Sequence, residues 1–301
     1  MSRLYVARGE DRRLDEEARR TVEGSFLELS DGITHYCLAG PPEGPLVVLV
    51  PGLTIPLGYW DPVAAPLRTR GFRTLAYSAY GRGWSDRVEG RYDPELFVRQ
   101  LAELLNVLAP GQRIHLVGTS LGGLVAMAYA TEAPGRLPLS MALIGPAGMA
   151  PKRPPLTGLL RHDAIARLLG SRLGARILDK HTANNVRRPQ DAQRLRQLLR
   201  EPARFHGTTY AVLSTLRDFP LTGRHDLYRR AGDLPVPKLL IWGRHDHVTP
   251  IGQLPTVRDL YRPSSSHILD HCGHMVPFED APTTVRLLLP FLSNRTGELP
   301  A

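Results

Sequence analysis

Residues 113–123 read Arg-Ile-His-Leu-Val-Gly-Thr-Ser-Leu-Gly-Gly, an apolar run that ends in a Gly-x-Ser-x-Gly turn. The run predicts a buried strand, and the apolar residues that follow over 121–133 predict a helix. A tight turn between a strand and a helix strains the serine at its centre, and the flanking Gly118 and Gly122 relieve the crowding. The N-terminus of the helix then faces any anion that forms at this point. Ser120 is therefore a candidate nucleophile.

The same order of apolar runs and helical patterns continues on both sides of this turn. A weak alternation around Asp31-Gly32 predicts a hairpin between residues 25 and 38. Further predicted strands lie at 45–50, 72–80, 113–119, 139–144, 238–242 and 267–269, and further predicted helices at 93–108, 253–261 and after Pro282. Alternating strands and helices predict an α/β fold with a mostly parallel, doubly wound sheet.

One segment interrupts the alternation and divides the chain into three parts. Residues 149–235 carry helical apolar spacing broken by Pro and Gly, so we interpret them as a helical cap, or lid, inserted after the sixth strand. Residues 25–148 and 236–301 form the predicted core. Residues 1–24 are a charged N-terminal arm, which we expect to be flexible or to form a surface helix.

Composition excludes several classes of protein. Of 301 residues, 42% are hydrophobic and 22% are charged, as in an ordinary soluble globular protein. No apolar stretch approaches the ~20 residues that span a bilayer, and the first residues are too charged for a secretory signal, so we expect a cytoplasmic protein. Cys37 and Cys272 are too few for a disulfide framework or a cysteine-based zinc site. We expect neither a metal nor a cofactor.

The net charge of +9 comes from one segment. Residues 151–236 hold 17 Arg or Lys against 7 Asp or Glu, whereas the rest of the chain is nearly balanced. Three interpretations are open: solvated arginine faces, a substrate that carries an anionic group, or attraction to an acidic membrane surface or partner. Nucleic acid is not expected, because aromatic residues are not interleaved with the basic ones. The sequence does not indicate an oligomeric state.

Two later segments supply the groups that a serine nucleophile needs. Asp246 follows the predicted strand 238–242, and His274 follows the last predicted strand. Carboxyl ends of parallel strands meet at one edge of a sheet, so Ser120, Asp246 and His274 should lie together there. A serine hydroxyl becomes nucleophilic when a histidine takes its proton and a carboxylate orients that histidine.

Nearby histidines suggest a metal site only superficially. His245 and His247 alternate along an extended chain and would point to opposite sides. We therefore expect no metal here, and we interpret Cys272 as a buried, unreactive thiol.

With Ser120, Asp246 and His274 in this order, the chain resembles the serine α/β-hydrolases, over about residues 25–148 and 236–293. The stretch 81–86 (Gly-Arg-Gly-Trp-Ser-Asp) resembles the loop that follows the fourth strand in this family. Within the family, the stretches 117–123 (Val-Gly-Thr-Ser-Leu-Gly-Gly) and 145–148 (Gly-Pro-Ala-Gly) resemble the monoacylglycerol lipases and the carbon–carbon bond hydrolases of aromatic degradation. The resemblance implies that the backbone N–H groups of Leu53 and Leu121 form an oxyanion hole. No carboxylate occurs between residues 144 and 148, so Asp246 has no rival as the acid.

The resemblance implies a serine hydrolase that cleaves a carboxylic ester of a hydrophobic substrate, possibly anionic in part, through an acyl-enzyme intermediate. Three alternatives use the same pocket. The first is a carbon–carbon bond hydrolase of a diketone-type substrate. The second is a cyclase or acyltransferase, in which a hydroxyl replaces water. The third is a ligand-binding protein that keeps an inactive triad.

Overall fold

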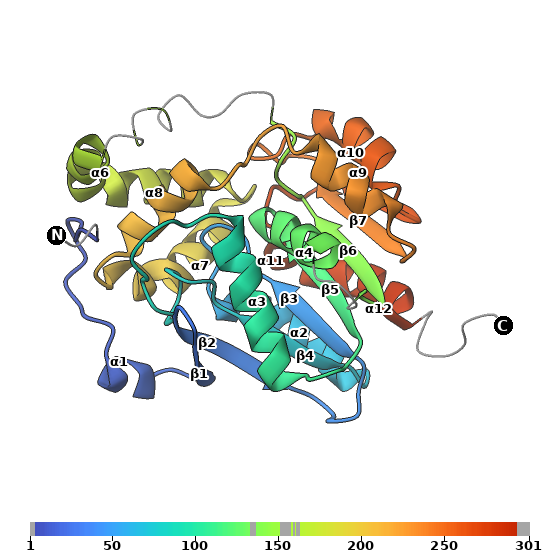
Figure 1. Cartoon of the computed structure of the whole chain (residues 1–301). Coiled ribbons are helices and arrows are strands. Elements are labelled where there is room, and N and C mark those ends of the chain that lie inside the picture. Colours follow the sequence, from blue (N-terminus) through green and yellow to red (C-terminus); the bar gives the residue numbers. More distant parts are fainter. Residues whose placement is uncertain (1–3, 133–136, 151–157, 159, 161–162, 294–301) are drawn as a thin grey trace.

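The computed structural model describes residues 4–132, 137–150, 158, 160 and 163–293. Short parts of the predicted arm, cap and core (1–3, 133–136, 151–157, 159, 161–162 and 294–301) therefore lie outside the described residues. At the centre lies one eight-stranded sheet in the order β1-β2-β4-β3-β5-β6-β7-β8 (Figure 1). The strands are β1 (Ser25–Leu29), β2 (Gly32–Ala39), β3 (Leu46–Val50), β4 (Arg73–Tyr77), β5 (Ile114–Thr119), β6 (Ser140–Ile144), β7 (Lys238–Gly243) and β8 (Ser265–Leu269).

The pairing of the strands confirms the predicted mostly parallel sheet. β3 to β8 are all parallel to one another, whereas the hairpin β1–β2 is added at one edge, where β2 pairs antiparallel with β4. Every residue of β3 is fully buried, because a central parallel strand is covered on both faces. Successive side chains of β3 enter opposite cores: Val48 joins one apolar cluster and Val47 the other.

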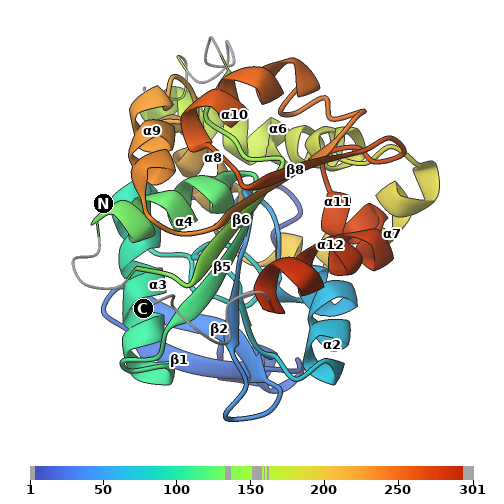
Figure 2. The ribbon, with the colours of Figure 1, turned by 90° about the vertical axis from the view of Figure 1, so that its right-hand side faces the viewer.

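Helices cover both faces of the sheet (Figure 2). The first apolar cluster, which contains Val48, packs beneath α3 (Pro94–Leu108), α4 (Leu121–Glu132), α9 (His225–Asp233) and α10 (Leu254–Tyr261). The second cluster packs beneath α2 (Asp61–Thr69), α11 (Val276–Glu279) and α12 (Ala281–Ser293). Short 3-10 turns precede two of these helices, η1 (Leu57–Trp60) before α2 and η3 (Ile251–Gln253) before α10. The sheet therefore separates two hydrophobic cores.

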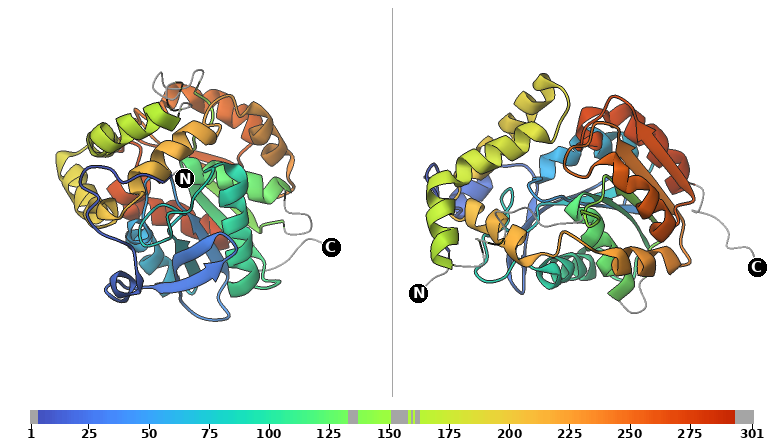
Figure 3. Two further views of the ribbon diagram at one scale, coloured as in Figure 1. Left: turned by 60° about the vertical axis from the view of Figure 1, so that its left-hand side comes forward. Right: turned by 90° about the horizontal axis from the view of Figure 1, so that it is seen from above.

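Helices from the segment after β6 lie beyond the carboxyl ends of the parallel strands (Figure 3). They are α6 (Asp163–Asn184), α7 (Pro189–Arg200), η2 (Pro202–Arg204) and α8 (Thr208–Asp218). α6 contacts both α7 and α8. α9, which also belongs to this segment, packs instead against α4 and α10 of the sheet layer. None of the described helices is both long enough and apolar enough to cross a membrane.

The described part of the N-terminal segment is fastened to these helices. It contains one short helix, α1 (Glu16–Arg20), whose N-terminus is capped by Asp15. Ahead of that helix, Tyr5 is buried with its ring edge-on to Tyr210 of α8, 5.5 Å between centroids. Buried Glu10 accepts backbone N–H bonds from Gly207 (2.8 Å) and Thr209 (2.6 Å). A surface helix was one of the two expectations; docking of the preceding residues was not expected.

Candidate active site

Ser120 occupies the turn between β5 and α4 with a φ of 53°, a left-handed conformation that a serine adopts only under local constraint. The glycines on either side are required by close backbone approach. A Cβ on Gly118 would lie 2.6 Å from the carbonyl oxygen of Gly122, and one on Gly122 would lie 2.3 Å from the carbonyl oxygen of Val50. The turn therefore has the geometry that the sequence predicted.

Asp246 lies just past the end of β7, and its buried carboxylate is fully hydrogen-bonded. One oxygen, Oδ1, accepts the backbone N–H groups of Val248 (2.8 Å) and Thr249 (2.7 Å). The other, Oδ2, accepts the Thr249 hydroxyl at 2.7 Å. These bonds hold the carboxylate in one orientation, with Oδ2 directed at the loop that follows β8.

That loop carries His274, whose ring is 3% exposed. Its Nδ1 lies 2.7 Å from Oδ2 of Asp246. Because an ionised carboxylate only accepts, Nδ1 carries the proton of this bond, and Nε2 keeps the lone pair in the neutral ring. Among the described residues, Nε2 has no hydrogen-bond partner. The imidazole is therefore oriented as a base whose free nitrogen points away from the acid.

Loop 144–147, after β6, connects Ser120 to this pair. The backbone N–H of Ser120 donates to the Ile144 carbonyl (3.0 Å), and the Ser120 carbonyl accepts from Ala147 N–H (3.1 Å). Between them, a Cβ on Gly145 would lie 3.1 Å from Asp246 Oδ2 and 3.5 Å from His274 Nδ1. One short loop thus touches all three predicted residues. Within the described chain the Ser120 hydroxyl makes no hydrogen bond to His274, a contact that free enzymes often close only with substrate.

The two backbone N–H groups that the resemblance implied for an oxyanion lie beside Ser120. Leu121 is the first residue of α4, and Leu53 follows Gly52, whose added Cβ would lie 3.3 Å from Ser120 Cβ. Neither N–H donates a hydrogen bond to any described residue. They are therefore available to an anion.

Arg82 supports the Leu53 loop. Its Nε donates to the Leu53 carbonyl at 2.7 Å. A surface contact between Arg82 and Asp86, which their closeness within the stretch 81–86 suggests, does not form. Asp86 pairs with Arg19, and Arg82 is buried.

Three further residues hold the histidine and acid in place and were not predicted as part of the site. The Thr249 hydroxyl, which donates to Asp246 Oδ2, also lies 3.3 Å from His274 Nδ1. The Asn185 carbonyl, at the end of α6, accepts the N–H of His274 at 2.9 Å. Glu279 accepts N–H groups from Gly273 and Met275, and burial raises the pKa of its carboxyl. Only Glu279 had a sequence signal, in the Phe278-Glu279 pair that follows the histidine.

Residues near the site offer little to a metal. His271, Cys272 and Asp280 have ligand atoms within 4.8 Å of one another. However, His271 Nε2 already lies 2.7 Å from Asp280 Oδ2. Cys272 is fully buried, and burial raises the pKa of its thiol to about 12.

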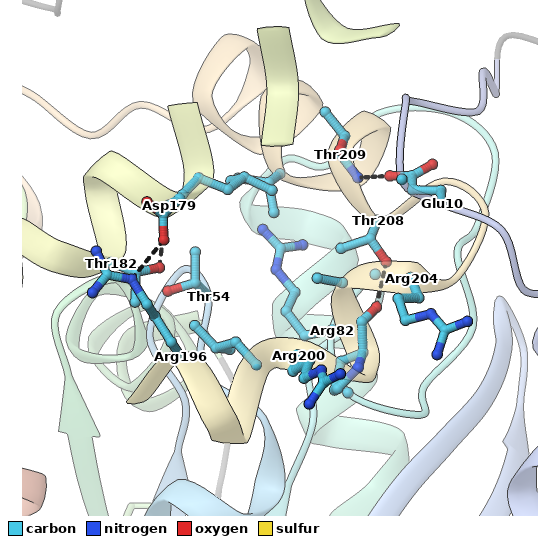
Figure 4. Close-up of a pocket in the computed structure, with 18 of the residues that line it drawn as sticks. Glu10, Thr54, Arg82, Asp179, Thr182, Arg196, Arg200, Arg204, Thr208 and Thr209 are labelled. Carbon is cyan, nitrogen blue, oxygen red and sulfur yellow. Dashed lines mark hydrogen bonds and ion pairs between the residues drawn. The ribbon is translucent and has the colours of Figure 1, made fainter. Parts of the chain in front are cut away.

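A cavity of about 490 Å³, hereafter the cap cavity, lies between the core loops and α6, α7 and α8 (Figure 4). Its core side is formed by Thr54, which follows Leu53, and by Arg82. Its other walls include Leu178, Thr182, Thr209 and Val212, together with several arginines. The cavity therefore borders the loop that carries Leu53 and extends under α6, α7 and α8. Ser120, Asp246 and His274 are not among the residues that line it.

Residues 47–286 match the model of the alpha/beta hydrolase family, so the chain belongs to that family, as its motifs predicted. The 2-hydroxy-6-oxononadienedioate/2-hydroxy-6-oxononatrienedioate hydrolase 1 of Pseudomonas putida is 28% identical over 239 residues, which cover 76% of this chain and 80% of that protein. The 2-hydroxy-6-oxo-6-phenylhexa-2,4-dienoate hydrolase of Comamonas testosteroni is 27% identical over 283 residues. That alignment covers 90% of this chain and 95% of the Comamonas protein.

Among solved structures, a thermophilic esterase from Thermogutta terrifontis aligns with a TM-score of 0.75 at 22% identity. The alignment covers 90% of this chain and 98% of the esterase. At this identity the likeness establishes the shared fold.

Proposed function

We propose that this protein is a serine hydrolase that cleaves a carboxylic ester of a hydrophobic substrate through an acyl-enzyme. The observation that carries the proposal is the buried 2.7 Å bond between His274 Nδ1 and Asp246 Oδ2, joined through loop 144–147 to a serine in a strained turn. A binding protein has no need of such a pair, since a buried carboxylate and imidazole are costly unless they are used or well bonded.

In the proposed reaction His274 Nε2 takes the proton of Ser120 as its oxygen attacks the substrate carbonyl. The Leu53 and Leu121 N–H groups stabilise the negative oxygen of the tetrahedral intermediate. Asp246 fixes the tautomer of the ring and stabilises the imidazolium. The proton then passes to the leaving alcohol. Water, activated by the same histidine, cleaves the acyl-enzyme; in an acyltransferase or cyclase a second hydroxyl would take its place.

The substrate class follows from the cap cavity. Apolar side chains such as Leu178 and Val212 line its walls, which favours a hydrophobic acyl or alcohol part. Because the cavity begins at Thr54, next to the proposed oxyanion loop, a bound ester would extend from Ser120 under α6 and α8.

A second candidate function is favoured by the relatives. Both curated proteins described above are named as hydrolases of 2-hydroxy-6-oxo compounds. If this chain shares their reaction, the same three side chains and the same two N–H groups would serve the cleavage of a carbon–carbon bond beside a ketone.

One panel tests both candidates. The protein is assayed with 4-nitrophenyl esters of increasing acyl length and with 2-hydroxy-6-oxo-6-phenylhexa-2,4-dienoate. We expect ester cleavage, and a loss of about 10³-fold or more in kcat for Ser120→Ala. The matched control, Ser30→Ala on the exposed hairpin turn, should be unaffected. Faster consumption of the dienoate than of every ester would favour the second candidate. Ester cleavage that survives Ser120→Ala would refute both.

A further inference from the structure

Arg82 is a buried cation with no anionic partner. Its side chain is buried at 3% exposure, and its terminal nitrogens donate to the Tyr80 carbonyl (2.7 Å) and the Thr215 hydroxyl (2.7 Å). With the Leu53 carbonyl on Nε, all three partners in the described chain are neutral oxygens. A buried charge is costly unless it is compensated, and here the protein supplies three neutral oxygens and the rings of Tyr92 and Phe97, whose centroids lie 5.7 and 5.5 Å from the guanidinium carbon, but no anion.

The acidic residues that line the cap cavity are occupied elsewhere. Glu10 accepts three backbone N–H groups at the start of α8 and in its own turn. Asp179 pairs with Arg196 at 2.7 Å on the exposed side. Burial lowers the pKa of Arg82 to about 10, so the guanidinium is still charged at neutral pH. No carboxylate among the described residues therefore pairs with this positive charge.

The guanidinium has donors to spare, and Arg82 is one of the residues that line the cap cavity. It carries five N–H groups, of which three are used, so each terminal nitrogen keeps one. Figure 4 shows the Arg82 side chain reaching up from its loop into the space between Thr54, Asp179 and Thr208. Further basic side chains, those of Arg8 and Arg200, line the same cavity, and neither forms an ion pair within the described chain.

We propose that the cap cavity binds a carboxylate group of the substrate at Arg82 while the reacting carbonyl lies at Ser120. This inference rests on the proposed hydrolase function and names its substrate class as an ester whose acyl part ends in a second carboxylate. The two points are linked directly, because Arg82 bonds the carbonyl of Leu53, the residue that follows Gly52 beside Ser120 and whose N–H serves the oxyanion in the proposed reaction.

A carboxylate fits better than a phosphate. One remaining N–H on each terminal nitrogen matches the two oxygens of a planar carboxylate, the fork arrangement that arginine favours. One buried guanidinium also neutralises one negative charge, whereas a phosphate dianion would bring a second negative charge into a cavity whose lining already holds the carboxylates of Glu10 and Asp179.

The test compares two esters of equal shape, 4-nitrophenyl hydrogen glutarate and 4-nitrophenyl 5-methylhexanoate, in which an isopropyl group replaces the carboxylate. We expect kcat/KM of the wild type to favour the acidic ester at least about tenfold. In Arg82→Met this preference should disappear, and Arg82→Lys, which keeps the charge but not the fork, should restore part of it. As a control, Arg70→Met removes the same charge at an exposed residue that directly follows α2, and it should leave the preference intact.

The ratio of the two rates is the readout, because Arg82→Met also loosens the Leu53 loop and should slow both esters by a common factor. A wild type that cleaves both esters equally, or prefers the neutral one, overturns the inference while the proposed function stands. If neither ester is cleaved, the proposed function fails, and calorimetric titration of the wild type with glutarate decides the site. Glutarate binding to the wild type that is lost in Arg82→Met and only weakened in Arg82→Lys supports the site, and absence of binding to the wild type overturns it.

Discussion

Substitution of Asp246 by Asn changes one atom of the site and leaves its scaffold in place. Oδ1 would still accept the N–H groups of Val248 and Thr249. The new NH₂ group would replace Oδ2, which now faces His274 Nδ1 at 2.7 Å and the Thr249 hydroxyl at 2.7 Å. An amide donates where the carboxylate accepted, so the ring must move its proton to Nε2 to accept at Nδ1. The nitrogen that faces the serine then cannot act as a base.

Two losses combine in this variant. The tautomer is wrong, and the imidazolium that forms in the reaction loses the charge opposite it. In a serine–histidine–aspartate site this change lowers kcat by roughly 10⁴-fold, or about 5.5 kcal/mol of transition-state stabilisation. Because three of the four hydrogen bonds of the side chain are retained or exchanged in kind, the free energy of unfolding should fall by no more than about 1 kcal/mol.

The assay is the steady-state kcat on the best ester of the panel, with thermal unfolding recorded on the same samples. Asp226→Asn, on the exposed side of α9, makes the same chemical change at a side chain that is 93% exposed and should not alter the rate. A fall of less than about tenfold in a folded Asp246→Asn protein would mean that Asp246 does not orient the base, and the reasoning would fail.

Three more predictions concern stability. Gly118→Ala should cost more than about 3 kcal/mol and abolish activity, because its Cβ would lie 2.6 Å from a backbone oxygen, whereas Gly252→Ala, with open space around it, should stay within about 0.5 kcal/mol by chemical denaturation. Glu10→Ala removes the carboxylate that accepts two backbone N–H groups at the start of α8, and should lower the free energy of unfolding by about 1–3 kcal/mol in the same assay. Glu16→Ala, at a side chain that is 84% exposed, should lower it hardly at all. Burial lowers the pKa of His115 to about 4, below its unfolded value, so the stabilising effect of the neutral ring is complete above about pH 6.5 and declines as the pH falls toward 4. His115→Gln should therefore make the melting temperature depend less on pH in this range. An unchanged pH dependence would contradict the prediction.

Residues with local signals could be predicted from the sequence. Ser120 lies between glycines that the backbone demands, and Asp246 and His274 follow apolar strands whose order fixes which edge they reach. The hairpin at residues 25–38 could be predicted in the same way, since the turn at Asp31-Gly32 connects β1 to β2. In each of these cases the cause lies within a few residues of the feature.

Other parts of the structure depend on partners far away in the chain. Glu10 carries no sign that it will cap a helix that begins 198 positions later, so the docked N-terminal segment was missed. α2 was not predicted because Pro62 and Pro66 interrupt its helical pattern, yet apolar Val63 and Leu67 are fully buried against the sheet.

The cap cavity was also beyond the reach of sequence. Arg82 is one of many arginines, and only the packing of α3 and α8 around it makes it a buried cation. Likewise, α9 has the same helical pattern as the cap helices, and its position on α4 and α10 is set by contacts that no local spacing reveals.

Fluorophosphonate labelling of the folded protein, followed by peptide mapping, examines the activation of Ser120 most directly. We predict a single phosphonyl adduct on the peptide that contains Ser120, formed rapidly in the native protein. The adduct should not form when the protein is denatured before labelling, or in His274→Ala. A folded protein that remains unlabelled, or one that carries the adduct on a different residue, would contradict the account.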